Sequence, residues 1–144
     1  MFIVHGSDDG KKEAVARLLS TLELAPIVLH EQANLGRTLI EKFEEHADVS
    51  YAVVLLTADD VGGHRGGTEP QRPRGRQNVV FELGYFVGWL GRKRVCTLYE
   101  AGVEMPSDFN GIVYIELDRA GAWRTLLARE LKAAGFEIDM NKAI

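Results

Sequence analysis

Short apolar runs rich in β-branched residues alternate along this chain with amphipathic stretches, and this alternation constrains the fold more than any other feature. It is the pattern of βαβ units, in which helices join parallel strands and cover both faces of the sheet. The run 51–56 is apolar throughout, as expected of a central strand that is buried on both faces. The sequence predicts strands at residues 1–5, 27–30, 50–57, 95–99 and 112–117.

The stretches between these runs carry apolar residues at the spacing of amphipathic helices. Those residues are Val15, Leu18, Leu19 and Leu22, then Leu35, Leu39, Ile40, Phe43 and Ala47, and finally Trp123, Leu126, Leu127 and Leu131, with Gly135 as a stop. We therefore expect an α/β fold with a flavodoxin-like, doubly wound sheet of about five parallel strands flanked by helices. Residues 1–144 are expected to form a single domain.

A further helix is predicted over residues 78–91, with Asn78 as its N-cap and Gly91 at its C-terminal end. Almost every position between them is apolar, so this helix is expected to be buried nearly all round. Gly84 and Gly88 would let a neighbouring element approach closely. The preceding segment, 62–76, is so rich in Gly, Pro and Arg that no regular element is expected there.

Composition excludes several classes of protein. Hydrophobic residues make up 46% of the 144 residues and charged residues 26%, and the net charge is −4, which provides no general attraction to nucleic acid or to an anionic membrane. No apolar run approaches the length needed to span a bilayer, roughly 20 residues. The single cysteine, Cys96, lies in an apolar run and is expected to be a buried structural thiol of a cytoplasmic protein. The four histidines are scattered, and no metal site is expected.

The ligand site is expected where the strand order reverses, at the carboxyl ends of the first and third strands. Residues 5–8, which include His5, Gly6 and Ser7, follow the first strand, and residues 57–60, which include Asp59, follow the third. Ser7 and Asp8 are also suited to capping the first helix, while Asp9 and Asp60 are interpreted as turn formers or helix caps. The helix that carries Glu82 begins soon after, which places Glu82 near the expected crevice.

Glu82 is the only charged residue between Gln77 and Gly91. An ionised carboxylate in apolar surroundings raises the free energy of the folded protein. It is usually tolerated because it pairs with a cation, has a raised pKa or faces a cleft. Two structural interpretations remain open beside a functional one. Glu82 interacts favourably with the N-terminal end of the helix dipole, or it pairs with Arg74 or Arg76.

Two arginine-bearing segments have both a structural and a functional interpretation. The loop with Arg65, Arg72, Arg74 and Arg76 is either a solvated loop or a flap that grips phosphate. Arg37 stands beside Thr38 at a helix N-terminus, either in a plain connection capped by Asn34 or Thr38 or in a loop for substrate or self-association. The loop lacks the lysine of a P-loop, which argues against an ATPase, and the chain has no G-x-G-x-x-G fingerprint, so a Rossmann-type redox enzyme is not expected.

Four segments together resemble one family. They are residues 2–6 (FIVHG), 34–38 (NLGRT), 53–60 (VVLLTADD) and 76–86 (RQNVVFELGYF), and Pro106-Ser107-Asp108 with Gly111 match as well. The chain resembles the bacterial Toll/interleukin-receptor (TIR) domains that serve as effectors of cyclic-nucleotide antiphage systems. The resemblance covers essentially the whole chain, and its most specific part is the stretch around Glu82.

The resemblance implies hydrolysis of NAD to nicotinamide and ADP-ribose, with Glu82 as the catalytic carboxylate and NAD as a substrate rather than a cofactor. Arg74, Arg76 and Asn78 would hold phosphate or ribose, and Phe81 or Tyr85 would stack on nicotinamide or simply pack in the core. The expected partners are other TIR domains and a regulatory nucleotide-sensing domain in a longer parent protein. Two alternatives remain: a deoxyribosyltransferase-like N-glycosidase acting on nucleosides, and a non-catalytic module that binds nucleotide or another TIR domain.

Overall fold

A five-stranded parallel sheet forms the centre of the protein. The computed structural model describes residues 1–28, 38–46, 48–106 and 110–144. The strand order is β2-β1-β3-β6-β7, and every neighbouring pair is parallel. The strands are β1 (Phe2–Val4), β2 (Ile27–Val28), β3 (Ala52–Leu56), β6 (Val95–Tyr99) and β7 (Val113–Glu116). The predicted α/β class, the strand order and the reversal point between β1 and β3 are confirmed. The strand β6 spans its predicted range, while β1, β3 and β7 are shorter than predicted, and residues 29 and 30 of the predicted second strand lie outside the described residues.

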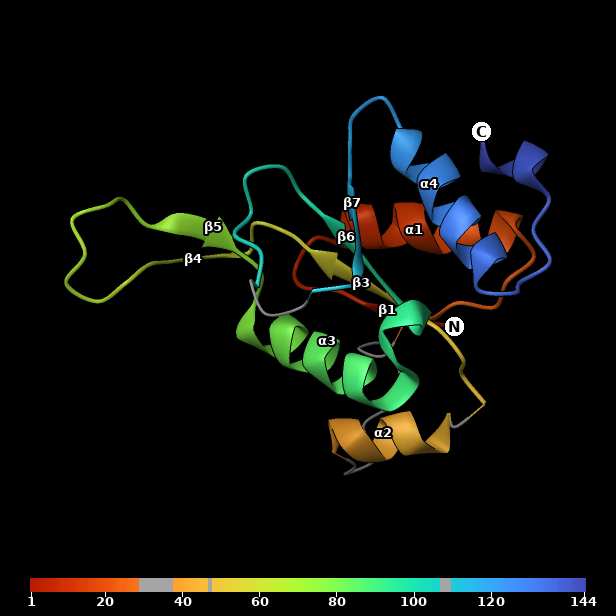
Figure 1. Cartoon of the computed structure of the whole chain (residues 1–144), viewed down its shortest axis with the longest axis horizontal. Helices are drawn as coiled ribbons and strands as arrows, with labels where there is room; N and C mark the ends of the chain where they lie inside the picture. The colour runs from red at the N-terminus through yellow and green to blue at the C-terminus, as the bar shows by residue number, and fades with distance from the viewer. Residues whose placement is uncertain (29–37, 47, 107–109) are drawn as a thin grey trace.

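Helices cover both faces of this sheet (Figure 1). The helices α1 (Asp9–Thr21) and α4 (Ala122–Ala133) lie on one face, and α2 (Leu39–Glu45) and α3 (Gln77–Leu90) on the other. Two 3₁₀ turns, η2 (Arg92–Arg94) and η3 (Met140–Ala143), are also present. Each face has its own core, because alternate side chains of every strand point to opposite sides. None of the described helices is long and apolar enough to cross a membrane.

The ends of α1 and α2 are fixed by side-chain caps. Asp8 accepts a hydrogen bond from the Lys11 backbone N–H, so Asp8 and not Ser7 caps α1. Thr38 caps α2 in a reciprocal capping box with Glu41. This confirms one of the two caps considered for α2, while Asn34 and the predicted helical position Leu35 lie outside the described residues.

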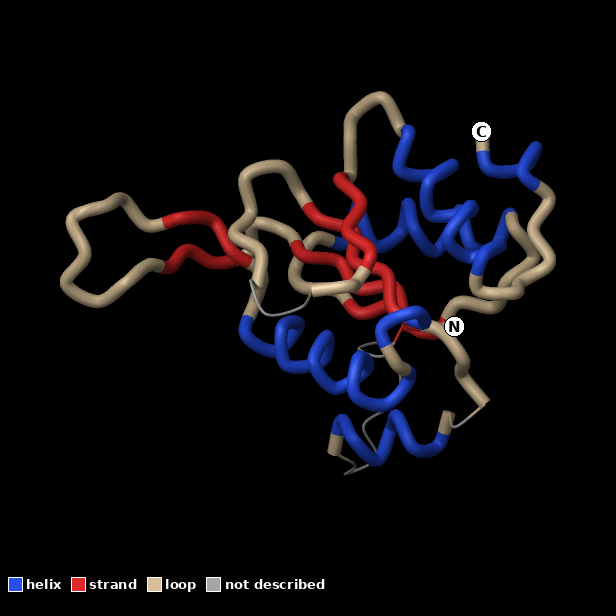
Figure 2. The backbone as a smooth tube through the Cα atoms, viewed as in Figure 1, coloured by secondary structure: helices blue, strands red, loops and turns tan. Residues whose placement is uncertain are grey.

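The segment between β3 and α3 forms a β-hairpin, so the prediction that residues 62–76 contain no regular element was wrong. The strands β4 (Asp60–Gly62) and β5 (Arg72–Arg74) pair antiparallel, and the hairpin projects from the body of the protein (Figures 1 and 2). Asp60 is therefore a strand residue and not the turn former expected. Pairing between distant residues stabilises a strand that local propensity opposes, because the backbone hydrogen bonds of both strands are then satisfied.

The helix α3 also differs from its prediction. It begins at Gln77 after Arg76, and no side chain caps it, so Asn78 is not the N-cap. The helix is not buried all round either, because Phe81 is 57% exposed and Trp89 37%. A Cβ added at Gly88 would meet no atom of the described residues within 4 Å, so none of them packs closely there. Gly91, with φ 84°, ends the helix as predicted.

Cys96 lies on β6 with no exposed surface, and burial raises the pKa of its thiol to about 12. Since the thiolate is the reactive form, we expect a disulfide reagent to label the native protein at least about a hundredfold more slowly than the urea-unfolded chain. Absorbance of the released thiol measures both rates. Equal rates in the native and unfolded protein would contradict the buried position of this strand.

Candidate functional site

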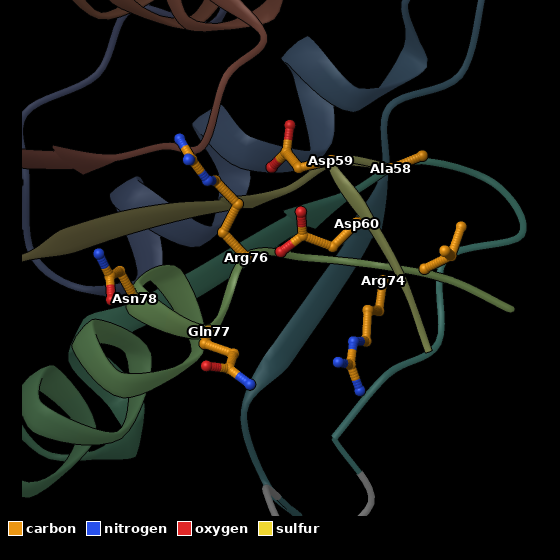
Figure 3. A pocket seen from close by; sticks show the side chains of 8 residues that line it. Ala58, Asp59, Asp60, Arg74, Arg76, Gln77 and Asn78 are labelled. Atoms are coloured by element: carbon orange, nitrogen blue, oxygen red, sulfur yellow. The ribbon is translucent and has the colours of Figure 1, made fainter. Parts of the chain in front are cut away.

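A pocket of about 600 Å³ opens beside the carboxyl end of β3, and ligand pockets in proteins span roughly 300–1,000 Å³. Three segments form it: the residues that follow β3, the base of the hairpin and the first turn of α3 (Figure 3). Its lining residues are Ala58, Asp59, Asp60, Val61, Arg74, Arg76, Gln77 and Asn78. This is the edge of the sheet where the reversal of strand order places ligands in doubly wound folds.

Asp59 joins the segments that follow β1 and β3. Its Oδ1 atom accepts hydrogen bonds from the Ser7 backbone N–H at 3.1 Å and the Ser7 hydroxyl at 2.5 Å. The Thr57 hydroxyl donates to Oδ2 at 2.8 Å. Gly6 lies against this carboxylate so closely that an added Cβ would overlap it. Both oxygens of Asp59 are thus engaged by the protein, and the residue acts mainly to position the pocket wall.

The other charged groups of the pocket are more available. Within the described parts of the chain, no hydrogen bond or ion pair engages the side chains of Asp60 and Arg76, and both are exposed. The guanidinium of Arg74 lies over Gly62, and its buried Nε atom has no hydrogen-bond partner. Two cations and one carboxylate are therefore free to meet a ligand that carries both phosphate and hydroxyl groups.

Glu82 lies inside the protein, one turn beyond the pocket. It has no exposed surface and shares the buried face of α3 with Leu83 and Phe86. It follows Asn78 by four residues, which places the two on the same side of the helix one turn apart, and of the two only Asn78 lines the pocket. Among the residues that the structure describes, neither Arg74 nor Arg76 forms an ion pair with Glu82, so one of the structural interpretations left open by the sequence does not hold.

The structure brings together four of the predicted binding residues and leaves others apart. Asp59, Arg74, Arg76 and Asn78 line one pocket, and Ser7 and Gly6 contact it through Asp59. His5 is buried just after β1 with Nδ1 2.8 Å from its neighbour's carbonyl oxygen, and it does not line the pocket. Arg37 lies outside the described residues.

Sequence reasoning missed two contributors to this edge of the sheet. Gln77 lines the pocket, and Glu100, just after β6, accepts a hydrogen bond from the Ala58 N–H at 3.0 Å. Asp60, which also lines the pocket, was expected at this edge but was interpreted as a turn former or helix cap. The Nζ atom of Lys11 lies 2.5 Å from Asp8 Oδ2 and 3.4 Å from Glu100 Oε2. The usable signal was that Glu100, like Asp59 and Asp60, directly follows a predicted strand, where side chains of neighbouring strands converge.

Replacing Asp8 with alanine is expected to lower the free energy of unfolding by about 1 kcal/mol at pH 7, because α1 loses its cap. The Lys11 side chain, together with the Lys11 backbone N–H, lowers the pKa of Asp8 below its usual 3.8. A carboxyl with a lowered folded-state pKa stabilises the protein above its unfolded-state pKa and loses that effect as pH falls through the folded-state value. Urea unfolding of both proteins should show a difference at pH 7 that shrinks below pH 3.8. Equal stability at pH 7 would contradict the capping role.

The described residues contain no group of three or more His, Cys, Asp or Glu side chains that could hold a metal ion. The polar side chains that line the pocket are arginine, amide and carboxylate groups. Arginine forks suit phosphate, and carboxylates accept hydrogen bonds from sugar hydroxyls. The combination suits a nucleotide, which carries both kinds of group.

Several known proteins are similar to this chain in sequence. Residues 1–119 match the family model of the TIR domain of CAP12/Pycsar effector proteins. The uncharacterized protein YuaY of Escherichia coli (strain K12) is 48% identical over this whole chain, which corresponds to 48% of YuaY. Protein tirC of Dictyostelium discoideum is 34% identical over 80% of this chain and 62% of its own length. The Pycsar effector protein BcPycTIR of Burkholderia cepacia is 41% identical over 54% of this chain and 25% of its own length. This chain thus spans about half the length of YuaY and less than two thirds of tirC.

Proposed function

Because the chain belongs to the family of CAP12 and Pycsar effector TIR domains, we propose that it cleaves the nicotinamide–ribose bond of NAD with Glu82 as the catalytic carboxylate. The observation that carries this proposal is the position of Glu82. It is a buried acid one helical turn beyond a pocket whose wall offers Arg74, Arg76 and Asn78 to a dinucleotide. The pocket lies at the reversal point of the sheet, where a ligand is expected on topological grounds.

The proposed reaction is a dissociative hydrolysis. The bond between the ribose C1′ atom and the nicotinamide nitrogen breaks, and its electron pair leaves with nicotinamide, which departs as a neutral molecule. The Glu82 carboxylate stabilises the ribosyl cation that develops, an effect that is strong where water is excluded. Water then adds to C1′ and releases a proton, which gives ADP-ribose. No general acid is needed, since the leaving group is already cationic before cleavage.

The burial of Glu82 sets a condition on this mechanism. Because Glu82 has no exposed surface, the ribose reaches it only after the side chains between the pocket and Glu82 rearrange. Asn78 is exposed at the pocket and stands one turn before Glu82, so it is the first residue that such a rearrangement displaces. Closure of the site around the ribose afterwards would exclude water from the developing cation.

We place this activity in a cytoplasmic effector of antiphage defence that is activated by association between TIR domains. Support for this setting comes from the family and from relatives that are longer than this chain, several of which carry the name Pycsar effector. The longer proteins have room for a second, regulatory domain that senses a nucleotide. NAD is the substrate in this proposal, and no cofactor or metal is invoked.

A second candidate function is supported by the same burial. A carboxylate without exposed surface is also what a module that binds nucleotide without reacting with it would contain. In that case the free cations of the pocket would hold the phosphates and Glu82 would serve only the fold.

One assay separates these functions and the remaining N-glycosidase alternative. Purified protein at high concentration, with a crowding agent to favour association, is given NAD or a deoxynucleoside with a second free base. Loss of NAD with release of nicotinamide supports the hydrolase. Base exchange on the deoxynucleoside without loss of NAD would instead identify a deoxyribosyltransferase. Binding of NAD without either reaction would identify the binding module.

A further inference from the structure

Asp60 is the one carboxylate of the pocket that the protein leaves open to a ligand. It is exposed at the pocket wall, and within the described residues no hydrogen bond or ion pair engages its side chain. Its neighbour Asp59 differs, because Ser7 and Thr57 occupy both of its oxygens. In Figure 3, Asp60 lies between Arg76 and Arg74.

The hairpin keeps Asp60 free even though a cation stands opposite it. Asp60 pairs in register with Arg74 across the antiparallel strands, and opposite charges in such positions normally interact. The Arg74 guanidinium lies instead over Gly62, in space that a Cβ at position 62 would fill. Because Gly62 has no side chain, the Arg74 guanidinium can occupy this space instead of pairing with Asp60. The carboxylate of Asp60 therefore remains available in the pocket.

The order of the polar groups matches the order of groups in a dinucleotide. Arg74, Arg76, Asn78 and Glu82 follow one another from the base of the hairpin into α3. If the reacting ribose lies at the Glu82 end, the diphosphate comes next to Arg76, the exposed cation in the middle of this series. The second ribose, which carries adenine, then reaches the base of the hairpin, where Asp60 stands.

We propose that Asp60 accepts hydrogen bonds from the 2′- and 3′-hydroxyls of the adenosine ribose and thereby selects NAD against NADP, its 2′-phosphorylated counterpart. A carboxylate suits the vicinal hydroxyls of ribose, as an acidic residue does in unrelated NAD-binding folds. The 2′-phosphate of NADP would bring its negative charge against the Asp60 carboxylate and would also remove the 2′-hydroxyl that donates to it. Both effects weaken the binding of NADP relative to NAD. The inference rests on the proposed function, since it takes the orientation of the dinucleotide from Glu82.

The test compares NAD and NADP as substrates for the wild-type protein and for Asp60→Asn, which removes the charge with little change in shape. We expect kcat/KM of the wild type to favour NAD by about tenfold or more, since like charges brought together at a binding site repel each other. In Asp60→Asn the preference should fall to about threefold or less, chiefly through faster use of NADP. The matched control is Glu69→Gln, which removes a carboxylate from the same hairpin outside this pocket and should keep the wild-type preference.

Direct binding separates this inference from the proposed function. Calorimetry with ADP-ribose and ADP-ribose 2′-phosphate requires no turnover. It therefore measures the effect of Asp60 on the affinity for the two ligands even in a protein that does not hydrolyse NAD. Loss of the preference for the ligand without a 2′-phosphate in Asp60→Asn, in either the kinetic or the calorimetric measurement, supports the proposal. Equal affinity of the wild type for both ligands, or a preference that Asp60→Asn leaves intact, overturns it. If neither dinucleotide is cleaved but the binding preference depends on Asp60, the proposed hydrolysis fails and the ribose contact stands.

Discussion

Replacing Glu82 with glutamine is expected to reduce nicotinamide release by about 10²–10³-fold, the usual effect of losing one group that stabilises charge in a transition state. Glutamine keeps the shape of the side chain but cannot balance a developing ribosyl cation with a full negative charge. The loss should appear in kcat, while the affinity for NAD changes little, because the carboxylate acts mainly on the charge formed during cleavage. Initial rates of nicotinamide release over a range of NAD concentrations give both quantities.

Two controls make the Glu82 result specific. Glu137→Gln removes an exposed carboxylate beyond α4, on the face of the sheet away from Glu82, and should keep the wild-type rate. Thermal unfolding shows whether Glu82→Gln retains the fold, which we expect because the change preserves the volume of a buried side chain. A folded Glu82→Gln protein as active as the wild type would contradict the assignment of the catalytic carboxylate.

Gly6→Ala is expected to disrupt the pocket wall and destabilise the protein by about 2 kcal/mol, the typical cost of forcing an extra carbon into a packed site. The added Cβ overlaps the Asp59 carboxylate, and that carboxylate has little freedom to move because Ser7 and Thr57 hold it. For a domain of this size the melting temperature should fall by about 4–8 °C. Nucleotide binding should weaken as well, since Asp59 positions one wall of the pocket.

A neighbouring glycine and a double variant test the cause of the Gly6 effect. Gly10 lies in the first turn of α1, and a Cβ there meets only the Asp8 Oδ1 atom, at 3.5 Å, so Gly10→Ala should be neutral or stabilising by about 0.5–1 kcal/mol. Adding Gly6→Ala to Asp59→Ala should cost much less than adding it to the wild type, because the clash has been removed. Strict additivity of the two changes would show that Gly6 acts through another contact.

The framework of the fold could be predicted from the sequence because it rests on burial. The apolar run that forms β3 predicts a central strand without any other information. The periodic leucines of α1 and α4 indicate which face of each helix is buried. The resemblance to TIR effectors around Glu82 predicted the family, and the family match confirms it. Both signals are local in the sequence.

The features that were mispredicted depend on contacts between distant residues. Pro73 and Gly62 are poor strand residues by local propensity, but they pair with Val61 and Arg72, respectively. Asn78 has the character of an N-cap, yet α3 begins earlier, at Gln77, just after Gly75. Gly75 lies so close to Leu56 that an added Cβ would come within 2.8 Å of its side chain. This close approach fixes where the chain enters the helix.

Within the site, the sequence could place residues at the correct edge but could not assign their roles. Asp59 and Asp60 are neighbours of the same type, and only the contacts of Ser7 and Thr57 show that one is engaged and the other free. Glu82 was identified as the one charge on an apolar helix. Whether such a charge faces the pocket or lies beneath it depends on the helix rotation, which is set by packing against the sheet.

The most direct test of the central claim is a time course of nicotinamide release from NAD by the wild-type protein at increasing protein concentration. The proposed function predicts that nicotinamide accumulates one for one with the NAD lost. It also predicts that the specific rate rises with protein concentration, because association between TIR domains activates the site. NAD that stays intact at every concentration, while calorimetry shows that the pocket binds it, would contradict hydrolysis and leave a nucleotide-binding module.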